Sequence, residues 1–384
     1  MNVLAAASQA TAVKRHIRVM VVDDAIVARR VLTRWIGTEP DMMIAGCLRT
    51  GREAVEQIEE YNPDVVVLDV DMPELDGISA LPLLLKKKND LVVIMASTLT
   101  RRSAEISLRA LSLGAADYVP KPEAATDPGS SAAFHRELID KIRNLGRRGR
   151  LLARQGQPVS VATPLRRAGT EVYSHGEAAA ITLRPFSSYL PRALLIGSST
   201  GGPQALTALM GTIGAASERV PILITQHMPP TFTTVLAEHL TGVCGRHVHE
   251  AEHNQAIVAG GVYVAPGGRH MRVKRGLDGA PTIALGDDPP INFCKPSVDP
   301  LLSSSASVWG PASLALVLTG MGNDGTQGAA DIVAAGGSVI AQDETTSVVW
   351  GMPRSVAQAG LCSAVLPLGE IAGKVNRLFA GDRI

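Results

Sequence analysis

The sequence predicts two α/β domains, each with a doubly wound parallel sheet, joined by a flexible linker. Short apolar runs alternate with helical patterns between residues 17 and 145, and again between residues 194 and 341. This alternation is typical of parallel strands covered by helices. At 384 residues the chain is long enough to bury two cores. Several of the runs end on polar residues, which places those residues at the sheet edge where ligands bind.

Composition excludes several classes of protein. Lys and Arg total 37 against 36 Asp and Glu, so no net field draws the chain to nucleic acid or to lipid. The four cysteines are far apart and fit neither a disulfide framework nor a zinc site, which indicates reduced thiols and a cytoplasmic location. No apolar run approaches the ~20 residues that cross a bilayer, and the N-terminus lacks the order of a signal peptide. We expect residues 1–15 to form a disordered extension and no segment to insert into a membrane.

The first half predicts five strands with helices between them. The expected strands are Ile17–Val22, Met42–Cys47, Val65–Leu68, Leu91–Ala96 and Asp117–Val119, and the expected helices are Ile26–Trp35, Gly51–Tyr61, Ile78–Lys88 and Ser103–Leu113. A further helix is indicated by apolar residues on one face, Phe134, Leu138, Ile139, Ile142 and Leu145. Its basic end is interpreted as a solvated face and not as a nucleic-acid site.

Charged and hydroxyl side chains end four of these strands: Asp23, Asp24, Asp69, Ser97 and Lys121. Carboxylates form a hard oxygen site suited to Mg²⁺, which completes its shell with phosphate oxygens. The hydroxyl and the ammonium can hold the other oxygens of a phosphoryl group. Asp residues at strand ends also cap helices, but capping explains one of these residues and not five that converge.

Four motifs connect this half to a known family: Val21-Val22-Asp23-Asp24, Leu68-Asp69-Val70-Asp71-Met72-Pro73 with Asp76-Gly77, Ser97, and Lys121-Pro122. With them, residues 16–130 resemble a response-regulator receiver domain, which has a flavodoxin-like fold. The resemblance implies that Asp69 is the phosphoacceptor for a cognate histidine kinase and that Mg²⁺ is held by Asp23, Asp24 and Asp69. It also implies that Ser97 and Lys121 contact the phosphoryl group and that Tyr118 is the switch aromatic.

Residues 131–190 are expected to hold the last receiver helix and then a linker. From residue 151 to 190 the sequence has no sustained period and little bulky apolar content. We interpret this part as a flexible, mostly exposed tether.

The second domain, residues 191–384, opens on the run Leu194–Ile196, the turn Gly197–Gly202 and a helical pattern from Pro203. This arrangement places Ser199 at a helix N-terminus, where free backbone N–H groups can hold negative charge. Three interpretations are open from this stretch alone: a nucleophile elbow, a phosphate cradle and a simple N-cap serine.

Two more strands bring candidate partners for Ser199. Pro221–Thr225 ends at His227, and Leu314–Leu318 ends at a loop that contains Asp324. If the three strands are neighbours, Ser199 attacks, His227 takes its proton and Asp324 fixes the imidazole tautomer. Thr200 and Met321 are then candidates for oxyanion donors. Further expected elements are a helix over Phe232–Leu240, strands Val262–Ala265 and Ser338–Ala341, and a helix over Gln327–Ala335. No metal is expected at the histidines of this domain, because their spacing fits no ligand pair: His239, His247, His249 and His253.

Five motifs in order resemble the chemotaxis receptor protein-glutamate methylesterase family: Ile196–Pro203, Thr225–Pro230, Tyr263–Gly267, Lys295–Asp299 and Leu318–Gly325. The resemblance implies a Rossmann-like catalytic domain in which Ser199, His227 and Asp324 hydrolyse γ-glutamyl methyl esters on chemoreceptor helices, and often deamidate glutamine there. It implies phosphorylation-dependent control, and no metal is expected in this domain. The alternative is a phosphorylation-dependent regulator whose second domain binds a nucleotide at Gly197–Gly202 and is not catalytic.

Overall fold

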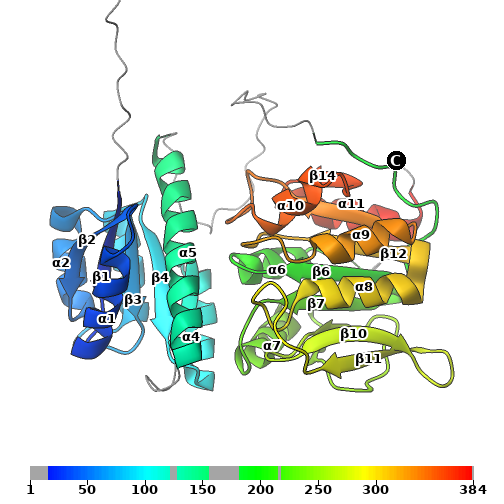
Figure 1. Ribbon diagram of the computed structural model, residues 1–384, viewed down its shortest axis with the longest axis horizontal. Coiled ribbons are helices and arrows are strands. Elements are labelled where there is room, and N and C mark those ends of the chain that lie inside the picture. Colours follow the sequence, from blue (N-terminus) through cyan, green and yellow to red (C-terminus); the bar gives the residue numbers. More distant parts are fainter. Residues whose placement is uncertain (1–15, 122–127, 155–180, 215–217, 383–384) are drawn as a thin grey trace, which may run out of the picture. The chain divides into compact units, whose positions relative to one another are not determined.

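The computed structural model describes residues 16–121, 128–154, 181–214 and 218–382. It contains two parallel sheets, each flanked by helices (Figure 1). The predicted extension at residues 1–15 and most of the predicted tether lie outside the described residues. No described helix is both long and apolar enough to cross a membrane.

The first sheet has five strands in the order β2-β1-β3-β4-β5. They are β1 (Ile17–Val22), β2 (Met42–Leu48), β3 (Val65–Asp69), β4 (Val92–Ser97) and β5 (Asp117–Pro120). The helices are α1 (Ile26–Gly37), α2 (Gly51–Tyr61), α3 (Gly77–Lys87), α4 (Arg101–Ser112) and α5 (Pro128–Arg154). Side chains of Thr50, Asp76 and Thr100 accept the N–H three residues on, which fixes where α2, α3 and α4 begin.

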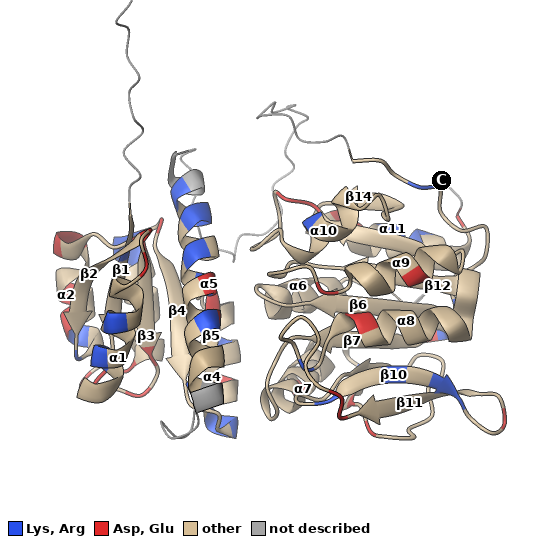
Figure 2. Cartoon of the chain, viewed as in Figure 1, with Lys and Arg blue, Asp and Glu red and all other residues tan. Residues whose placement is uncertain are grey.

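Helix α5 carries many of the basic side chains of this half (Figure 2). Arg143 lies 2.6 Å from Glu39 and 2.9 Å from Asp41, and Arg150 lies 2.6 Å from Asp64. The hydrogen bond from Arg143, only partly opposed by burial, lowers the pKa of Asp41. The expectation of a merely solvated basic face was wrong here, because loops of the same sheet place carboxylates against the helix.

The second sheet has seven strands in the order β14-β13-β12-β6-β7-β9-β8. They are β6 (Ala193–Ser198), β7 (Ile222–Gln226), β8 (Val248–Glu250), β9 (Val262–Val264), β12 (Ser313–Val317), β13 (Ser338–Gln342) and β14 (Ala364–Leu366). All the paired strands of this sheet are parallel. From β6 the chain first builds outward through β7, and later through β12 on the other side. The strand order therefore reverses at β6, which is where ligands bind in open α/β sheets.

Helices cover both faces of the second sheet. Helices α8 (Val298–Trp309) and α9 (Thr326–Ala334) pack together on one face, visible in front of the strands in Figure 1. Helices α6 (Gly202–Met210), α7 (Phe232–Cys244) and α11 (Leu368–Ala380) form a second group, in which α6 contacts both of the others. Helix α10 (Met352–Gln358) packs on β12, β13 and α9.

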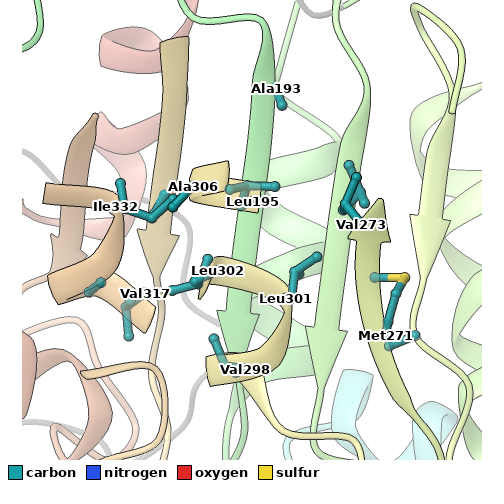
Figure 3. Close-up of a cluster of buried hydrophobic side chains, with 14 of the residues drawn as sticks. Ala193, Leu195, Met271, Val273, Val298, Leu301, Leu302, Ala306, Val317 and Ile332 are labelled. Atoms are coloured by element: carbon teal, nitrogen blue, oxygen red, sulfur yellow. The ribbon is translucent and has the colours of Figure 1, made fainter. Parts of the chain in front are cut away.

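The core under α8 follows the two-residue period of the strands. Ala193 and Leu195 of β6 belong to the same buried cluster as Leu301 and Leu302 of α8, and all four side chains are fully buried (Figure 3). Gly197 continues this face of β6, and a Cβ there would lie 2.4 Å from Val298. The strand that leads to Ser199 is thus packed directly against α8.

The structure adds elements that the sequence analysis did not predict. An antiparallel pair, β10 (His270–Arg275) and β11 (Pro281–Gly286), stands beside the parallel sheet. Helices α8, α10 and α11 and strands β8 and β14 were also not predicted. Charged residues in β10 and serines in α8 weaken the periodic signals, because tertiary packing rather than local pattern stabilises these segments.

The segment before β6 is held by hydrogen bonds to the second domain. The N–H of Arg184 donates to the carbonyl of Cys362, the N–H of Ser187 to the hydroxyl of Ser338, and the N–H of Arg192 to the carbonyl of Ala312. The ordered part of the second domain therefore includes residues that the sequence analysis assigned to the exposed tether.

Candidate active site

Ser199 follows the last residue of β6 and is half-buried. Its N–H donates to the carbonyl of Thr319, 3.0 Å away, and its carbonyl accepts the N–H of Gly202 at 2.7 Å. Gly201 adopts a φ of 75° as the N-cap of α6. The strand, the tight turn and the helix thus have the form of a nucleophile elbow.

Gln226 at the end of β7 fixes this elbow from the neighbouring strand. Its Oε1 accepts the hydroxyl of Ser198 at 2.6 Å, and its Nε2 donates to the carbonyl of Ser199 at 2.9 Å. A Cβ on Gly202 would lie 1.9 Å from Oε1, so the turn requires glycine there. Gln226 was not assigned a role from the sequence, because its partners are distant in the chain.

Three neighbouring strands, β12, β6 and β7, carry Asp324, Ser199 and His227 in or next to the loops that follow them. The last registered pair of β6 and β7 is Ser198 with Gln226, and the N–H of His227 donates to the carbonyl of Ser198. Nε2 of His227 lies 2.7 Å from Oδ2 of Asp324. The adjacency that the sequence analysis made a condition of the triad is therefore present.

Asp324 is buried at the N-terminus of α8. Its carboxylate accepts the hydroxyl of Ser297 at 2.7 Å and the N–H groups of Val298 at 2.7 Å and Gly325 at 2.9 Å. Burial alone would raise the pKa of Asp324, but the hydrogen bond and charge of His227, with the donors of Val298 and Ser297, hold it well below its usual range. The carboxylate is therefore ionised and able to stabilise an imidazolium.

The second ring nitrogen of His227 faces a thiol. Nδ1 lies 3.3 Å from Sγ of Cys294, and the side chain of His227 is 11% exposed. Since Nε2 is engaged by Asp324, Nδ1 is the nitrogen left to act as a base. The hydroxyl of Ser199 makes no hydrogen bond with any residue that the structure describes.

The two candidate oxyanion donors lie on either side of Ser199. Thr200 is buried in the elbow, and neither its N–H nor its hydroxyl has an acceptor among the described residues. Met321 is half-buried in the loop after β12. That loop passes close to the elbow, because a Cβ on Gly320 would lie 2.9 Å from Cβ of Ser199.

The four histidines that the sequence analysis did not expect to bind a metal contact other residues in the described structure. Nε2 of His239 lies 3.1 Å from the hydroxyl of Thr207, and Nδ1 of His253 accepts the N–H of Leu285. The rings of His247 and His249 contact each other edge to face, with centroids 4.3 Å apart.

In the first sheet, three carboxylates gather at the ends of β1 and β3. Asp23 and Asp69 are buried and Asp24 is exposed, and one oxygen of each lies within 4.8 Å of the others. The N–H of Ala25 donates to Asp23, and the N–H of Val70 donates to Asp69. An all-oxygen donor set of this density fits a Mg²⁺ ion.

The other predicted receiver residues lie on β4 and β5. Ser97 ends β4, and its hydroxyl lies 2.9 Å from that of Ser107 on α4. The N–H of Lys121, which follows β5, donates to the carbonyl of Ser97. Tyr118 on β5 is 4% exposed.

Each half of the chain matches a known protein family. The family model described as CheB methylesterase matches residues 194–375, and that of the response regulator receiver domain matches residues 19–127. A protein-glutamate methylesterase/protein-glutamine glutaminase of Rhodopseudomonas palustris is 57% identical over 395 residues, covering 100% of both chains. The chain belongs to the CheB methylesterase family. A second protein-glutamate methylesterase/protein-glutamine glutaminase, from Bradyrhizobium diazoefficiens, is also 57% identical and covers 96% of this chain and 95% of its own.

Solved CheB structures cover each half separately. The Thermotoga maritima CheB methylesterase catalytic domain is 39% identical, covers 49% of this chain and 98% of its own, and has a TM-score of 0.47. The response regulator domain of Thermotoga maritima CheB is 43% identical over 34% of this chain and 95% of its own, with a TM-score of 0.31. Family membership supports the esterase interpretation and not the nucleotide-binding alternative.

Three site residues of this CheB-family chain were missed in sequence: Gln226, Cys294 and Ser297. A signal for Ser297 existed, since Ser-Val-Asp-Pro reads as an N-cap followed by a helical first turn. Gln226 lies inside the motif Thr225–Pro230, but the sequence does not show its partners on β6, and none of the five motifs includes Cys294.

Proposed function

We propose that this chain is a protein-glutamate methylesterase, with protein-glutamine glutaminase activity, whose catalytic group is Ser199 with His227 and Asp324. The observation that carries the proposal is the 2.7 Å contact between His227 and Asp324 beside the elbow at the switch point of the sheet. The proposed substrates are glutamyl methyl esters on the cytoplasmic helices of chemoreceptors, by extension from the relatives, which are protein-glutamate methylesterases.

The geometry supports a two-step acyl transfer. The oxygen of Ser199 attacks the ester carbonyl while its proton passes to Nδ1 of His227, and Asp324 stabilises the imidazolium through Nε2. The imidazolium then protonates the departing methoxide, so methanol leaves and a glutamyl ester of Ser199 remains. Water attacks this ester with His227 again as base, which releases glutamate and restores the serine. With a glutamine substrate the same steps release ammonia.

The oxyanion of each tetrahedral intermediate needs donors near Ser199. We assign this role to the backbone N–H groups of Thr200 and Met321. The free N–H of Thr200 at the start of α6 supports the first assignment, and the close packing of the loop after β12 on Ser199 supports the second.

Phosphorylation is proposed to occur on Asp69, with a histidine kinase as phosphodonor. The receiver family match and the carboxylate cluster support this assignment. Asp23, Asp24 and Asp69 would hold Mg²⁺, which when bound offsets the negative charge of the phosphoryl group. Ser97 and Lys121 would hold phosphoryl oxygens, and Tyr118 would repack in response.

The proposed activity is tested by demethylation of a radiolabelled methylated chemoreceptor. We expect Ser199→Ala to remove nearly all methanol release, because members of a catalytic triad act as a unit. Ser303→Ala, a half-buried serine on α8, serves as the matched control and should retain activity. A fluorophosphonate probe should label the wild type at Ser199 and leave Ser199→Ala unlabelled. Substantial turnover by Ser199→Ala would refute the assignment.

A further inference from the structure

The sulfur of Cys294 contacts Nδ1 of His227, the nitrogen that accepts the proton of Ser199 in the proposed mechanism. The imidazole lies between Oδ2 of Asp324, 2.7 Å from Nε2, and Sγ of Cys294, 3.3 Å from Nδ1. The proton of Ser199 must pass to Nδ1. Sulfur and hydroxyl therefore compete for one position on the ring.

A tight turn holds Cys294, whose sulfur lies beside Nδ1 of His227. Ile291 and Cys294 exchange both backbone hydrogen bonds, at 3.1 and 2.8 Å, around Asn292 and Phe293. These two central residues have φ of 51° and 64°, a left-handed conformation that residues other than glycine rarely adopt. The side chain of Asn292 donates to Asp299 on α8, which ties the turn to the helix that holds Asp324. A strained conformation that the surroundings hold in place is frequent at functional sites.

We propose that Cys294 is a positioning residue of this esterase. Its sulfur holds Nδ1 of His227 in the resting enzyme, so that Nδ1 accepts the proton of Ser199 only at higher pH. The proposal rests on the proposed function. Cys294 does not touch substrate in this scheme and acts only through His227.

Electrostatics support this role. The ionisable groups that face His227 are Cys294 and Asp324, with Asp299 behind Asp324 and His270 behind Ser297. Burial alone would lower the pKa of His227, but its interaction with Cys294, 3.3 Å from Nδ1, and the hydrogen bond that Nε2 donates to Asp324 raise it to about 10. A protonated imidazole cannot accept the proton of Ser199. Cys294 therefore moves the onset of activity to higher pH.

The test is the pH profile of demethylation by the full-length Cys294→Ala protein, with kcat and KM measured separately from pH 5.5 to 10. We expect the acid limb of kcat to move at least one unit toward lower pH, with KM unchanged. Each unit raises the neutral fraction of His227, and so the rate well below the pKa, about tenfold. Cys294→Ser keeps a hydrogen-bonding group and should move the limb less. Cys244→Ala, another partly buried thiol, is the matched control.

An unchanged acid limb in Cys294→Ala would overturn the proposal, as would a fall in kcat at every pH without movement of the limb. If the variant does not fold, methyl methanethiosulfonate on the folded wild type replaces it. The thiolate attacks the reagent sulfur, a methyl disulfide forms and methanesulfinate leaves. We expect the acid limb of the modified protein to move toward lower pH and dithiothreitol to restore the wild-type profile, and an unmoved limb after mass-verified modification of Cys294 would contradict the role. Fluorophosphonate labelling of Ser199 separates the outcomes, because its absence in the wild type refutes the proposed function itself.

Discussion

Asp324 shows how one buried side chain serves both the fold and the chemistry. Its carboxylate accepts donors from the first turn of α8 and from Ser297 while it orients His227. The hydrogen bonds of Asp324 thus join the loop after β12 to the start of α8 and also orient the imidazole of His227. A change at this residue should affect catalysis more than stability if it keeps the shape.

We predict that Asp324→Asn lowers turnover on the order of 10⁴-fold, because an amide leaves His227 in the wrong tautomer. The measurement is methanol release from a methylated receptor at saturating substrate. Asp331→Asn on α9, which is only partly buried, is the control and should behave as the wild type. A loss of less than tenfold with a native circular dichroism spectrum would argue against Asp324 as the orienting group.

The pKa of His227 also predicts how stability depends on pH. The folded value, about 10, lies above the unfolded value of 6.5, so this group contributes stability that is fully present below pH 6.5. That contribution is lost as pH rises from 6.5 through about 10. Urea unfolding of the second domain should therefore show a decline over this window that is smaller in His227→Gln. If the free energy of unfolding depends on pH equally in the two proteins, the pKa of His227 is not raised by folding.

At the scale of elements, α8 links the core to the site. Its N-terminus holds Asp324 while Leu301 and Leu302 pack on β6, the strand that ends at the elbow. Packing of the helix therefore positions two members of the proposed triad at once.

We predict that Leu302→Ala destabilises the protein by about 2–5 kcal/mol, since it opens a cavity in a fully buried layer. Leu277→Ala, at an exposed position between β10 and β11, should change stability by less than about 0.5 kcal/mol. Urea denaturation followed by tryptophan fluorescence measures both. Equal effects of the two variants would show that α8 does not pack as described.

At the scale of the whole molecule, two parallel sheets each gather polar groups at the carboxyl ends of their strands. In the first the group is a set of carboxylates, and in the second it is a serine, a histidine and an aspartate. In the proposed function the first set binds a phosphoryl group and the second carries out acyl transfer.

We predict that phosphorylation of Asp69 raises esterase activity. A fragment of residues 181–384 should be more active than the unphosphorylated full chain, and Asp69→Ala should hold the full chain in its low-activity state. The fragment begins at 181 because Arg184 and Ser187 bond to the second domain. Demethylation rates at equal concentration decide the matter. Equal rates for fragment and full chain would mean that phosphorylation acts on localisation or partner choice instead.

Metal removal should separate the two sites. We predict that a chelator abolishes transfer of phosphate to Asp69 in the full chain and leaves methanol release by the fragment unchanged, since the all-oxygen ligand set that Mg²⁺ prefers is that of the receiver carboxylates. Phosphorylation is followed with a radiolabelled phosphodonor. Loss of fragment activity in the chelator, restored by added metal, would contradict the expectation of a metal-free esterase.

The sequence by itself determined the fold class and the family. Buried parallel strands are short, apolar and bounded by turn residues, so β1, β3, β6, β7 and β12 were predicted within two residues of their ends. Ser199, His227 and Asp324 were predicted to lie at one edge because parallel strands bring their carboxyl ends together whatever the details of packing.

Only the tertiary structure decided the contacts around those residues. That Asp324 sits on the N-terminus of α8, that Gln226 clamps the elbow and that Cys294 faces Nδ1 of His227 all depend on segments far apart in the chain. Helix α8 and the β10–β11 pair escaped prediction for the same reason. Their local patterns are weak, and the free energy that forms them comes from burial against the rest of the domain.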